Sequence, residues 1–217
     1  MYNISKSCQI KTLGEIYLKY FNNRNDGIFV EVGAYDGESF SNTSCLADAG
    51  WWGVYVEPVA KFYDKCKKRH EHNNITVLNN SVGGEEKQIE LLIAGPITTT
   101  RTDQFNIYEE IGWLKNRETD KAICSQITLN RVLVENNIPI HFDLLVVDVE
   151  GNEGDVIHSF ELSKWLPRML IVELEDKHPS FKKYTEHCKE HANLREYICS
   201  QGYTQVYCDS INTVFVV

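Results

Sequence analysis

Short apolar runs alternate with longer amphipathic segments along most of the chain. The apolar runs are rich in β-branched residues, as is typical of strands buried inside a sheet. The predicted strands cover 28–34, 53–57, 75–82, 143–149 and 169–174, with a weaker hairpin strand at 87–94. The predicted helices cover 13–21, 39–49, 59–70, 129–136, 152–160 and 181–200. This alternation predicts a parallel sheet with helices on both faces.

The C-terminal pattern departs from the alternation of strands and helices. Two strands are expected at 203–208 and 213–217, separated only by a short turn around Asp209 and Ser210. A parallel crossover needs a dozen or more residues, so these strands must form an antiparallel hairpin. A parallel sheet with such a hairpin differs from the usual dinucleotide-binding arrangement and favours a methyltransferase.

One polar segment, 95–122, has no sustained hydrophobic period. A connection of this length inside a compact domain usually has a function of its own. We therefore expect 95–122 to be a substrate loop or lid, with a helical part around 107–116. No linker or repeat divides the chain, so 1–217 is predicted to be a single domain in which 1–25 form a helical lead-in.

Composition and charge exclude several classes of protein. The chain has 217 residues, of which 42% are hydrophobic and 24% charged, as in an ordinary globular domain. A net charge of −9 argues against a general nucleic-acid binder. No stretch has the length and hydrophobicity of a membrane span, and the first ten residues lack a signal-peptide core. We expect a cytoplasmic protein that binds neither nucleic acid nor membranes.

The cysteines favour the same compartment. Their number, seven, is odd, and no pair has Cys-x-x-Cys spacing. Without an export signal, the expected state is reduced thiols.

The turn after the first predicted strand indicates a small-molecule site. The apolar run breaks at Gly33, and a second glycine follows at Gly37 before a polar, helix-starting segment. A strand, a glycine turn and a helix N-terminus together form a cradle for the charged end of a ligand. Tyr35 stands where the pattern Gly-x-Gly-x-x-Gly has its second glycine, which lets the backbone approach a pyrophosphate. We therefore expect a nucleoside ligand without phosphates, with S-adenosylmethionine as the main candidate.

Acidic residues end successive predicted strands, where ligands bind in open α/β sheets. Glu57, 24 residues after Gly33, is placed to accept hydrogen bonds from ribose hydroxyls, and Asp148 and Glu150 end a later strand. Carboxylates complement a sulfonium and an ammonium group, whereas they would repel phosphates. The ligand's own carboxylate is expected to face the helix that begins near Glu38. Each acidic residue taken alone is equally consistent with a capping role at the following helix.

Five spaced motifs resemble the FkbM family of S-adenosylmethionine-dependent methyltransferases. They are Phe-Val-Glu-Val-Gly-Ala-Tyr-Asp-Gly-Glu-Ser (29–39), Trp-Gly-Val-Tyr-Val-Glu-Pro (52–58), Ile-Thr-Leu (127–129), Asp-Leu-Leu-Val-Val-Asp-Val-Glu-Gly-Asn-Glu (143–153) and Leu-Ile-Val-Glu (170–173). The resemblance implies a class I methyltransferase fold, with a seven-stranded sheet in the order 3-2-1-4-5-7-6 and strand 7 antiparallel. It also implies O-methylation of a sugar hydroxyl in a glycan or a glycosylated metabolite.

The resemblance also assigns residues to the site. Glu31, Gly33, Asp36, Gly37 and Glu57 fall on cofactor-binding positions, and Asp148 and Glu150 on the floor of the active site. Together with the strand ends, where Asn80 to Gly83 suit an adenine, the expected cofactor-binding set is Glu31, Gly33, Ala34, Asp36, Gly37, Glu57, Pro58, Ser81, Val82 and Asp148.

A sugar hydroxyl is a poor nucleophile at neutral pH, so a base or a metal should assist it. The expected catalytic residues are Asp148, Glu150 and His178; histidine has the best-matched pKa, whereas Asp148 is better placed. A Mg²⁺ ion held by Asp148 with Glu173 and Glu175 is a less favoured alternative.

His187 and His191 lie at i, i+4. We expect them on an exposed helix face, with metal binding as a minor alternative.

Two other functions stay open at this point. One is a non-catalytic cofactor-binding module that serves as a partner in an assembly. The acidic residues at the strand ends argue against it, because a site that had lost its activity need not keep all of them. The other is a nicotinamide-dependent oxidoreductase, which Tyr35 and the terminal hairpin disfavour. The expected partner is a small-molecule or glycan acceptor, and the sequence defines no oligomeric state.

Overall fold

The computed structural model describes residues 4–217. Its α-helices are α1 Ile4–Ser7, α2 Lys11–Phe21, α3 Ser44–Asp48, α4 Ala60–Arg69, α5 Thr102–Glu110, α6 Leu129–Glu135, α7 Glu153–His158, α8 Leu162–Trp165 and α9 Thr185–Ser200. Its strands are β1 Ile28–Val32, β2 Trp52–Val56, β3 Ile75–Leu78, β4 Ser81–Val82, β5 Lys87–Ile93, β6 Asp120–Ile127, β7 Leu144–Val147, β8 Met169–Glu173, β9 Thr204–Cys208 and β10 Asn212–Val216. Three short 3₁₀ helices are η1 Gly95–Ile97, η2 Glu175–Lys177 and η3 Pro179–Phe181. No helix among these residues is long and apolar enough to cross a membrane.

Seven strands form the main sheet in the order β3-β2-β1-β7-β8-β10-β9. The pairs are parallel except those of β10 with β8 and β9, which confirms the mostly parallel sheet with an antiparallel C-terminal hairpin. The labels differ from the expected numbering because β4, β5 and β6 form a separate three-stranded sheet, which was not predicted. Counted along the chain without those three, the strands of the main sheet run 3-2-1-4-5-7-6.

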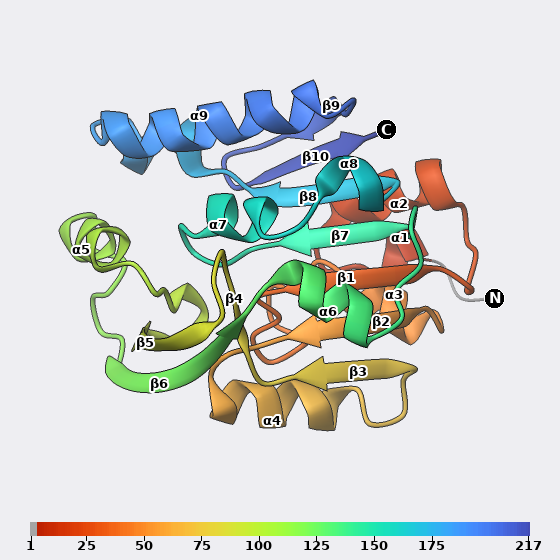
Figure 1. The fold of residues 1–217 in the computed structure, drawn as a ribbon, viewed down its shortest axis with the longest axis horizontal. Coiled ribbons are helices and arrows are strands. Elements are labelled where there is room, and N and C mark those ends of the chain that lie inside the picture. The colour runs from red at the N-terminus through yellow and green to blue at the C-terminus, as the bar shows by residue number, and fades with distance from the viewer. Residues whose placement is uncertain (1–3) are drawn as a thin grey trace.

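Successive strand residues point to opposite faces of the sheet, so each face has its own core. Val30 and Leu145 lie in a cluster with residues of α6 to α9, including Leu133. Phe29 lies in the other cluster, with residues of α1 to α3 such as Leu13. Figure 1 shows the parallel strands pointing toward the side of the molecule that carries β5, β6 and α5. The unexpected second sheet and the 95–122 segment therefore lie at the carboxyl ends of the parallel strands.

Two predicted elements are reduced to about half their expected length. The apolar run 75–82 is divided between β3 and β4, because Asn79 leaves the sheet and its Nδ2 donates hydrogen bonds to the carbonyls of Glu57 and Pro58. The helix expected over 39–49 is reduced to α3, since Phe40 adopts a left-handed backbone conformation with φ of 62°.

The 95–122 segment is mostly ordered secondary structure. It contains η1, α5 and the first residues of β6, and its helix begins earlier than the expected 107–116. The strand β6 pairs antiparallel with β5 over seven residue pairs, from Lys87 with Gln126 to Ile93 with Asp120. The polar side chains of β6 concealed this strand in the sequence.

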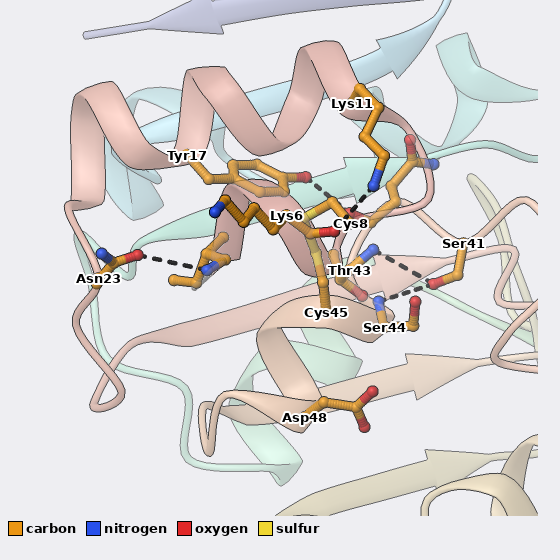
Figure 2. The surroundings of a disulfide bond; sticks show 12 residues. Lys6, Cys8, Lys11, Tyr17, Asn23, Ser41, Thr43, Ser44, Cys45 and Asp48 are labelled. Carbon is orange, nitrogen blue, oxygen red and sulfur yellow. Dashed lines mark hydrogen bonds between the residues drawn. A yellow bond between two sulfur atoms is a disulfide. The ribbon is translucent and has the colours of Figure 1, made fainter. Parts of the chain in front are cut away.

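The prediction that all thiols are reduced is wrong for one pair. Cys8 and Cys45 form a disulfide whose Cα atoms lie 4.9 Å apart (Figure 2). Both cysteines are buried where the segment after α1 packs against α3. Sequence spacing carries no information about this contact, because the two residues are 37 positions apart.

Replacing Cys8 with Ser is expected to lower the free energy of unfolding by about 4 kcal/mol. The disulfide closes a loop of 37 residues and so restricts the unfolded chain. Urea denaturation without reductant measures the effect, with exposed Cys199→Ser as the control. Equal unfolding midpoints for C8S and the wild type would show that the bond contributes nothing.

Candidate active site

A cavity of about 740 Å³ opens at the carboxyl ends of β1, β2, β7 and β8. This volume is within the usual range for small-molecule sites. The predicted residues that line it are Glu31, Gly33, Ala34, Glu57, Pro58, Ser81, Val82, Asp148 and Glu150. Asp36, Gly37 and His178 are not among its lining residues. Residues from other parts of the chain, such as Gln9, Asn42 and Asn212, complete the wall and were not predicted, whereas Trp113 comes from the expected substrate loop.

The turn after β1 requires a glycine at position 33. Gly33 has φ of 94°, and a Cβ atom there would lie 1.7 Å from the carbonyl oxygen of Asp148. The amides of Gly33 and Ala34 both donate to the carbonyl of Val56, at 2.9 and 3.1 Å. Close packing of this turn against β2 and the end of β7 therefore depends on the missing side chain.

Asp36 and Gly37 shape the same turn from outside the cavity. Asp36 Oδ1 accepts hydrogen bonds from the amides of Glu38 and Ser39, at 3.0 and 2.7 Å. Gly37 has φ of 74°, and a Cβ atom there would lie 2.8 Å from Cys66 Sγ. Both residues support the loop rather than line the site. Aspartate side chains often accept hydrogen bonds from backbone amides two or three residues further on, so the Asp-Gly pair in the sequence is typical of a turn.

Glu57 links two segments of the cavity wall. Its Oε2 accepts the amide of Tyr35 at 2.9 Å, and its Oε1 accepts the amide of Val59 at 2.7 Å. Each carboxylate oxygen can accept a second hydrogen bond, which leaves capacity for a diol. Burial raises the pKa of Glu57 to about 8.

Three carboxyl groups meet on the cavity floor. Oxygen atoms of Asp148, Glu150 and Glu173 lie within 4.8 Å of one another. Burial, followed by the mutual repulsion of these groups, raises the pKa of Glu150 and Glu173 well above the ordinary range, and burial also raises the pKa of Asp148. The neighbouring Glu173 and Asn42 side chains partly offset this rise in the pKa of Asp148. Uncompensated carboxylates this close favour a cation or bound protons.

Glu150 has a distinct arrangement within this group. Its backbone is left-handed, with φ of 58°, and its Oε2 accepts a hydrogen bond from the Tyr108 hydroxyl. Its Oε1 has no hydrogen-bond partner among the described residues. One carboxylate oxygen is therefore fixed, while the other is available to a ligand in the cavity.

The cavity wall also carries acceptor atoms without donors. Within residues 4–217, Asn42 Oδ1, Glu173 Oε2 and Asn212 Oδ1 are buried and lack hydrogen-bond partners. Arg117 is the single basic residue in the described lining. Orphaned acceptors and clustered carboxylates fit a ligand that carries positive charge and hydrogen-bond donors. The S-adenosylmethionine ammonium and sulfonium groups meet that description.

His178 lies behind the cavity wall. Its ring packs edge-on against Trp113, with centroids 5.3 Å apart, and its Nδ1 accepts the amide of Ser180 at 3.2 Å. Trp113 lines the cavity, whereas His178 does not. His178 therefore stabilises the start of η3 and does not line the cavity in which an acceptor would bind.

The expectation that His187 and His191 are exposed is wrong, because both are buried beside Glu175. His187 Nε2 lies 3.0 Å from Glu175 Oε2. His191 Nδ1 accepts the amide of Glu175 at 2.8 Å, and burial lowers the pKa of His191 to about 3, so its proton is on Nε2. Neither nitrogen of His191 then offers a lone pair to a metal. In the other acidic group, Glu150 takes the place expected for Glu175 beside Asp148 and Glu173.

The unfolding free energy of the ligand-free protein is expected to fall as the pH rises from about 5 to 8. Burial raises the pKa of Glu31, Glu57 and Glu153 to about 8, so the folded state binds more protons than the unfolded state in this window. By linkage, stability declines by up to about 1.4 kcal/mol per pH unit for each group. Denaturant unfolding at several pH values measures the slope. Glu31→Gln should reduce this slope, and exposed Glu109→Gln should not. A free energy of unfolding that rises with pH would contradict this prediction.

The sheet order, the terminal hairpin and the acidic cavity at the carboxyl ends of the strands define a class I methyltransferase. The Methyltransferase FkbM domain matches residues 31–204, more than half of the sequence, and the chain belongs to this family.

One solved structure shares the fold, and two further methyltransferase structures are similar at lower TM-scores. The METTL16 MTase domain superposes with a TM-score of 0.50 at 14% identity, covering 95% of this chain and 66% of that one. This chain thus spans slightly less than two thirds of that domain. The magnesium protoporphyrin IX methyltransferase ChlM from Synechocystis PCC 6803, with bound SAH, gives 0.49 at 10% identity, covering 94% and 80%. A putative caffeoyl-CoA O-methyltransferase from Staphylococcus aureus gives 0.49 at 13%, covering 96% and 84%. No curated protein sequence matches the chain.

Proposed function

We propose that this protein transfers a methyl group from S-adenosylmethionine to a hydroxyl of a sugar, a glycan or a glycosylated metabolite. The observation that carries the proposal is the group of Asp148, Glu150 and Glu173 on the cavity floor. These carboxylates complement a cationic donor, and one of them can accept the proton that a hydroxyl must lose. The FkbM resemblance supports the choice of a sugar hydroxyl.

The donor would occupy the wall built by the strand ends. Glu57 would accept the ribose hydroxyls with the lone pairs that its two backbone bonds leave free. Ser81 and Val82 would contact the adenine, and the Gly33 turn would let the methionine part approach the backbone. Asn42 and Asp148 would face the ammonium group.

Within this proposal, Glu150 is the base. Asp148 would face the ammonium group of the donor, whereas Glu150 lines the cavity and its Oε1 has no hydrogen-bond partner among the described residues. A carboxylate whose pKa lies above the ordinary value is a stronger base than a free carboxylate. When bound, the donor would supply a methyl group on positively charged sulfur. The acceptor oxygen would bond to the methyl carbon while the carbon–sulfur bond on the opposite side breaks. Holding acceptor and donor in near-attack geometry can supply about 7–11 kcal/mol of the barrier reduction.

Two measurements test the proposal in sequence. Calorimetry with S-adenosylhomocysteine and with NADH separates a methyl-donor site from a nicotinamide site, and failure to bind the former would overturn the proposal. A mass-spectrometric screen of glycan acceptors then searches for a donor-dependent gain of one methylene unit, with and without EDTA. Loss of turnover in EDTA would assign a metal to the acidic floor. Binding without any mass gain would favour the non-catalytic module.

A further inference from the structure

The helix α5 is attached to the turn that carries Glu150. Arg101 Nη1 donates to the carbonyl of Gly151 at 3.0 Å, and Asn152 Nδ2 donates to Thr100 Oγ1 at 3.0 Å. A Cβ atom at Gly151, which has φ of 99°, would lie 2.9 Å from the Gln104 side chain. The 95–122 segment and the end of β7 therefore form one packed unit.

Tyr108 is the residue of α5 that reaches Glu150. Its side chain is fully buried, and its hydroxyl donates to Glu150 Oε2. The hydroxyl oxygen lies 3.5 Å from Glu175 Oε1, while Gln104 Nε2 donates to Glu175 Oε2 at 2.8 Å. The ring stacks on Trp113, with centroids 5.4 Å apart. Ring packing fixes the phenol, so its hydroxyl has a defined position against the carboxylate.

Apart from Tyr108, the titratable groups within residues 4–217 that act on Glu150 are acidic. They are Asp148 after β7, Glu173 on β8, Glu175 in η2 and Glu153 on α7. Each raises the free energy of an ionised Glu150 by like-charge repulsion. A hydrogen bond donated to the carboxylate acts in the opposite direction, because it stabilises the charged form.

We propose that Tyr108 is a positioning residue for Glu150. The catalytic consequence of this role rests on the proposed function. The phenol holds Oε2 and so directs Oε1 into the cavity. It also stabilises the ionised form of Glu150 against the repulsion of its acidic neighbours. According to this proposal, the 95–122 segment contributes to the cavity floor through Tyr108 of α5.

Tyr108→Phe tests the proposal, because it removes the hydroxyl and keeps the packed ring. The pKa of Glu150 is read from ¹³C-carboxyl NMR titration, with the resonance assigned by its loss in Glu150→Gln. We expect Tyr108→Phe to raise this pKa by about one unit, which corresponds to about 1.4 kcal/mol. The acid limb of the kcat profile should move up by the same amount, and kcat should fall about tenfold at pH values below it. Affinity for S-adenosylhomocysteine should change less than twofold.

The matched control is Tyr184→Phe. Tyr184 also donates its hydroxyl to a glutamate, Glu110 Oε2 at 2.8 Å, but on the exposed side of α5. This variant should leave the Glu150 titration and kcat unchanged. If Tyr108→Phe does not fold, site-specific 3-fluorotyrosine at position 108 replaces it. A more acidic phenol there should lower the Glu150 pKa.

The two readouts separate the proposals. An unchanged Glu150 titration in Tyr108→Phe, or an equal shift in Tyr184→Phe, overturns the positioning role whatever the activity. A shifted titration in a protein that methylates no acceptor upholds the positioning role and overturns the proposed function.

Discussion

Glu150→Gln should lower kcat by about 10²- to 10⁴-fold and leave the affinity for S-adenosylhomocysteine within a few fold. A positioned general base contributes rate enhancement of this size, and the amide keeps the shape of the side chain. The amide oxygen of this variant would also still accept the Tyr108 hydrogen bond, so the local structure should persist. Single-turnover methyl transfer combined with calorimetry measures the two effects separately.

Two companion variants decide whether Glu150 is the base. Asp148→Asn should weaken donor binding and reduce kcat less than Glu150→Gln does, because Asp148 is proposed to face the ammonium group of the donor rather than the acceptor hydroxyl. Exposed Glu110→Gln, which also removes a carboxylate that accepts a tyrosine hydroxyl, should have no effect on turnover. Near-normal turnover in Glu150→Gln together with a large loss in Asp148→Asn would transfer the role to Asp148.

Gly33→Ala should reduce the affinity for S-adenosylhomocysteine by about 100-fold or more. A methyl group at this position would overlap the Asp148 carbonyl, only 1.7 Å away, and the backbone φ of 94° is unfavourable for alanine. The β1 turn and the end of β7 would have to separate, and both line the cavity. A loss of 100-fold corresponds to about 2.8 kcal/mol. Calorimetry gives the affinity, and the melting temperature shows how much of the fold is affected.

Gly84→Ala is the control for this substitution. Gly84 is exposed, and a Cβ atom there would have no neighbour within 4 Å. The affinity of the Gly84→Ala variant for S-adenosylhomocysteine and its melting temperature should match those of the wild type. If Gly33→Ala also bound normally, the turn after β1 would have no part in holding the donor.

The sequence predicts the main sheet well because its strands have unambiguous patterns. Leu144 to Val147 form an unbroken apolar run, and all four are buried. Parallel strands end at one edge of the sheet, so acidic residues at strand ends, such as Glu57 and Asp148, could be placed in the site without coordinates. The two-residue strand β4 could not be separated from β3, since both belong to one apolar run.

The remaining site residues depend on contacts between distant segments. Asn42 follows a left-handed residue in a loop, and Asn212 belongs to the terminal hairpin, so no local pattern relates them to Glu173. His178 was proposed as a base from the ordinary pKa of histidine and from its position just past a strand end, but its ring packs against Trp113 and does not line the cavity. Tertiary packing, rather than residue type, determined both outcomes.

The segment that follows α1 has a consequence for how far the chain can be shortened. Gln9 and Ile10 line the cavity, and Gln9 Nε2 donates to the carbonyl and the carboxylate of Glu38, at 2.7 and 2.8 Å. The adjacent Cys8 is covalently tied to Cys45. The family match begins only at residue 31. The cavity wall therefore includes residues that the shared family domain does not contain, and a fragment cut to that domain would have an open site.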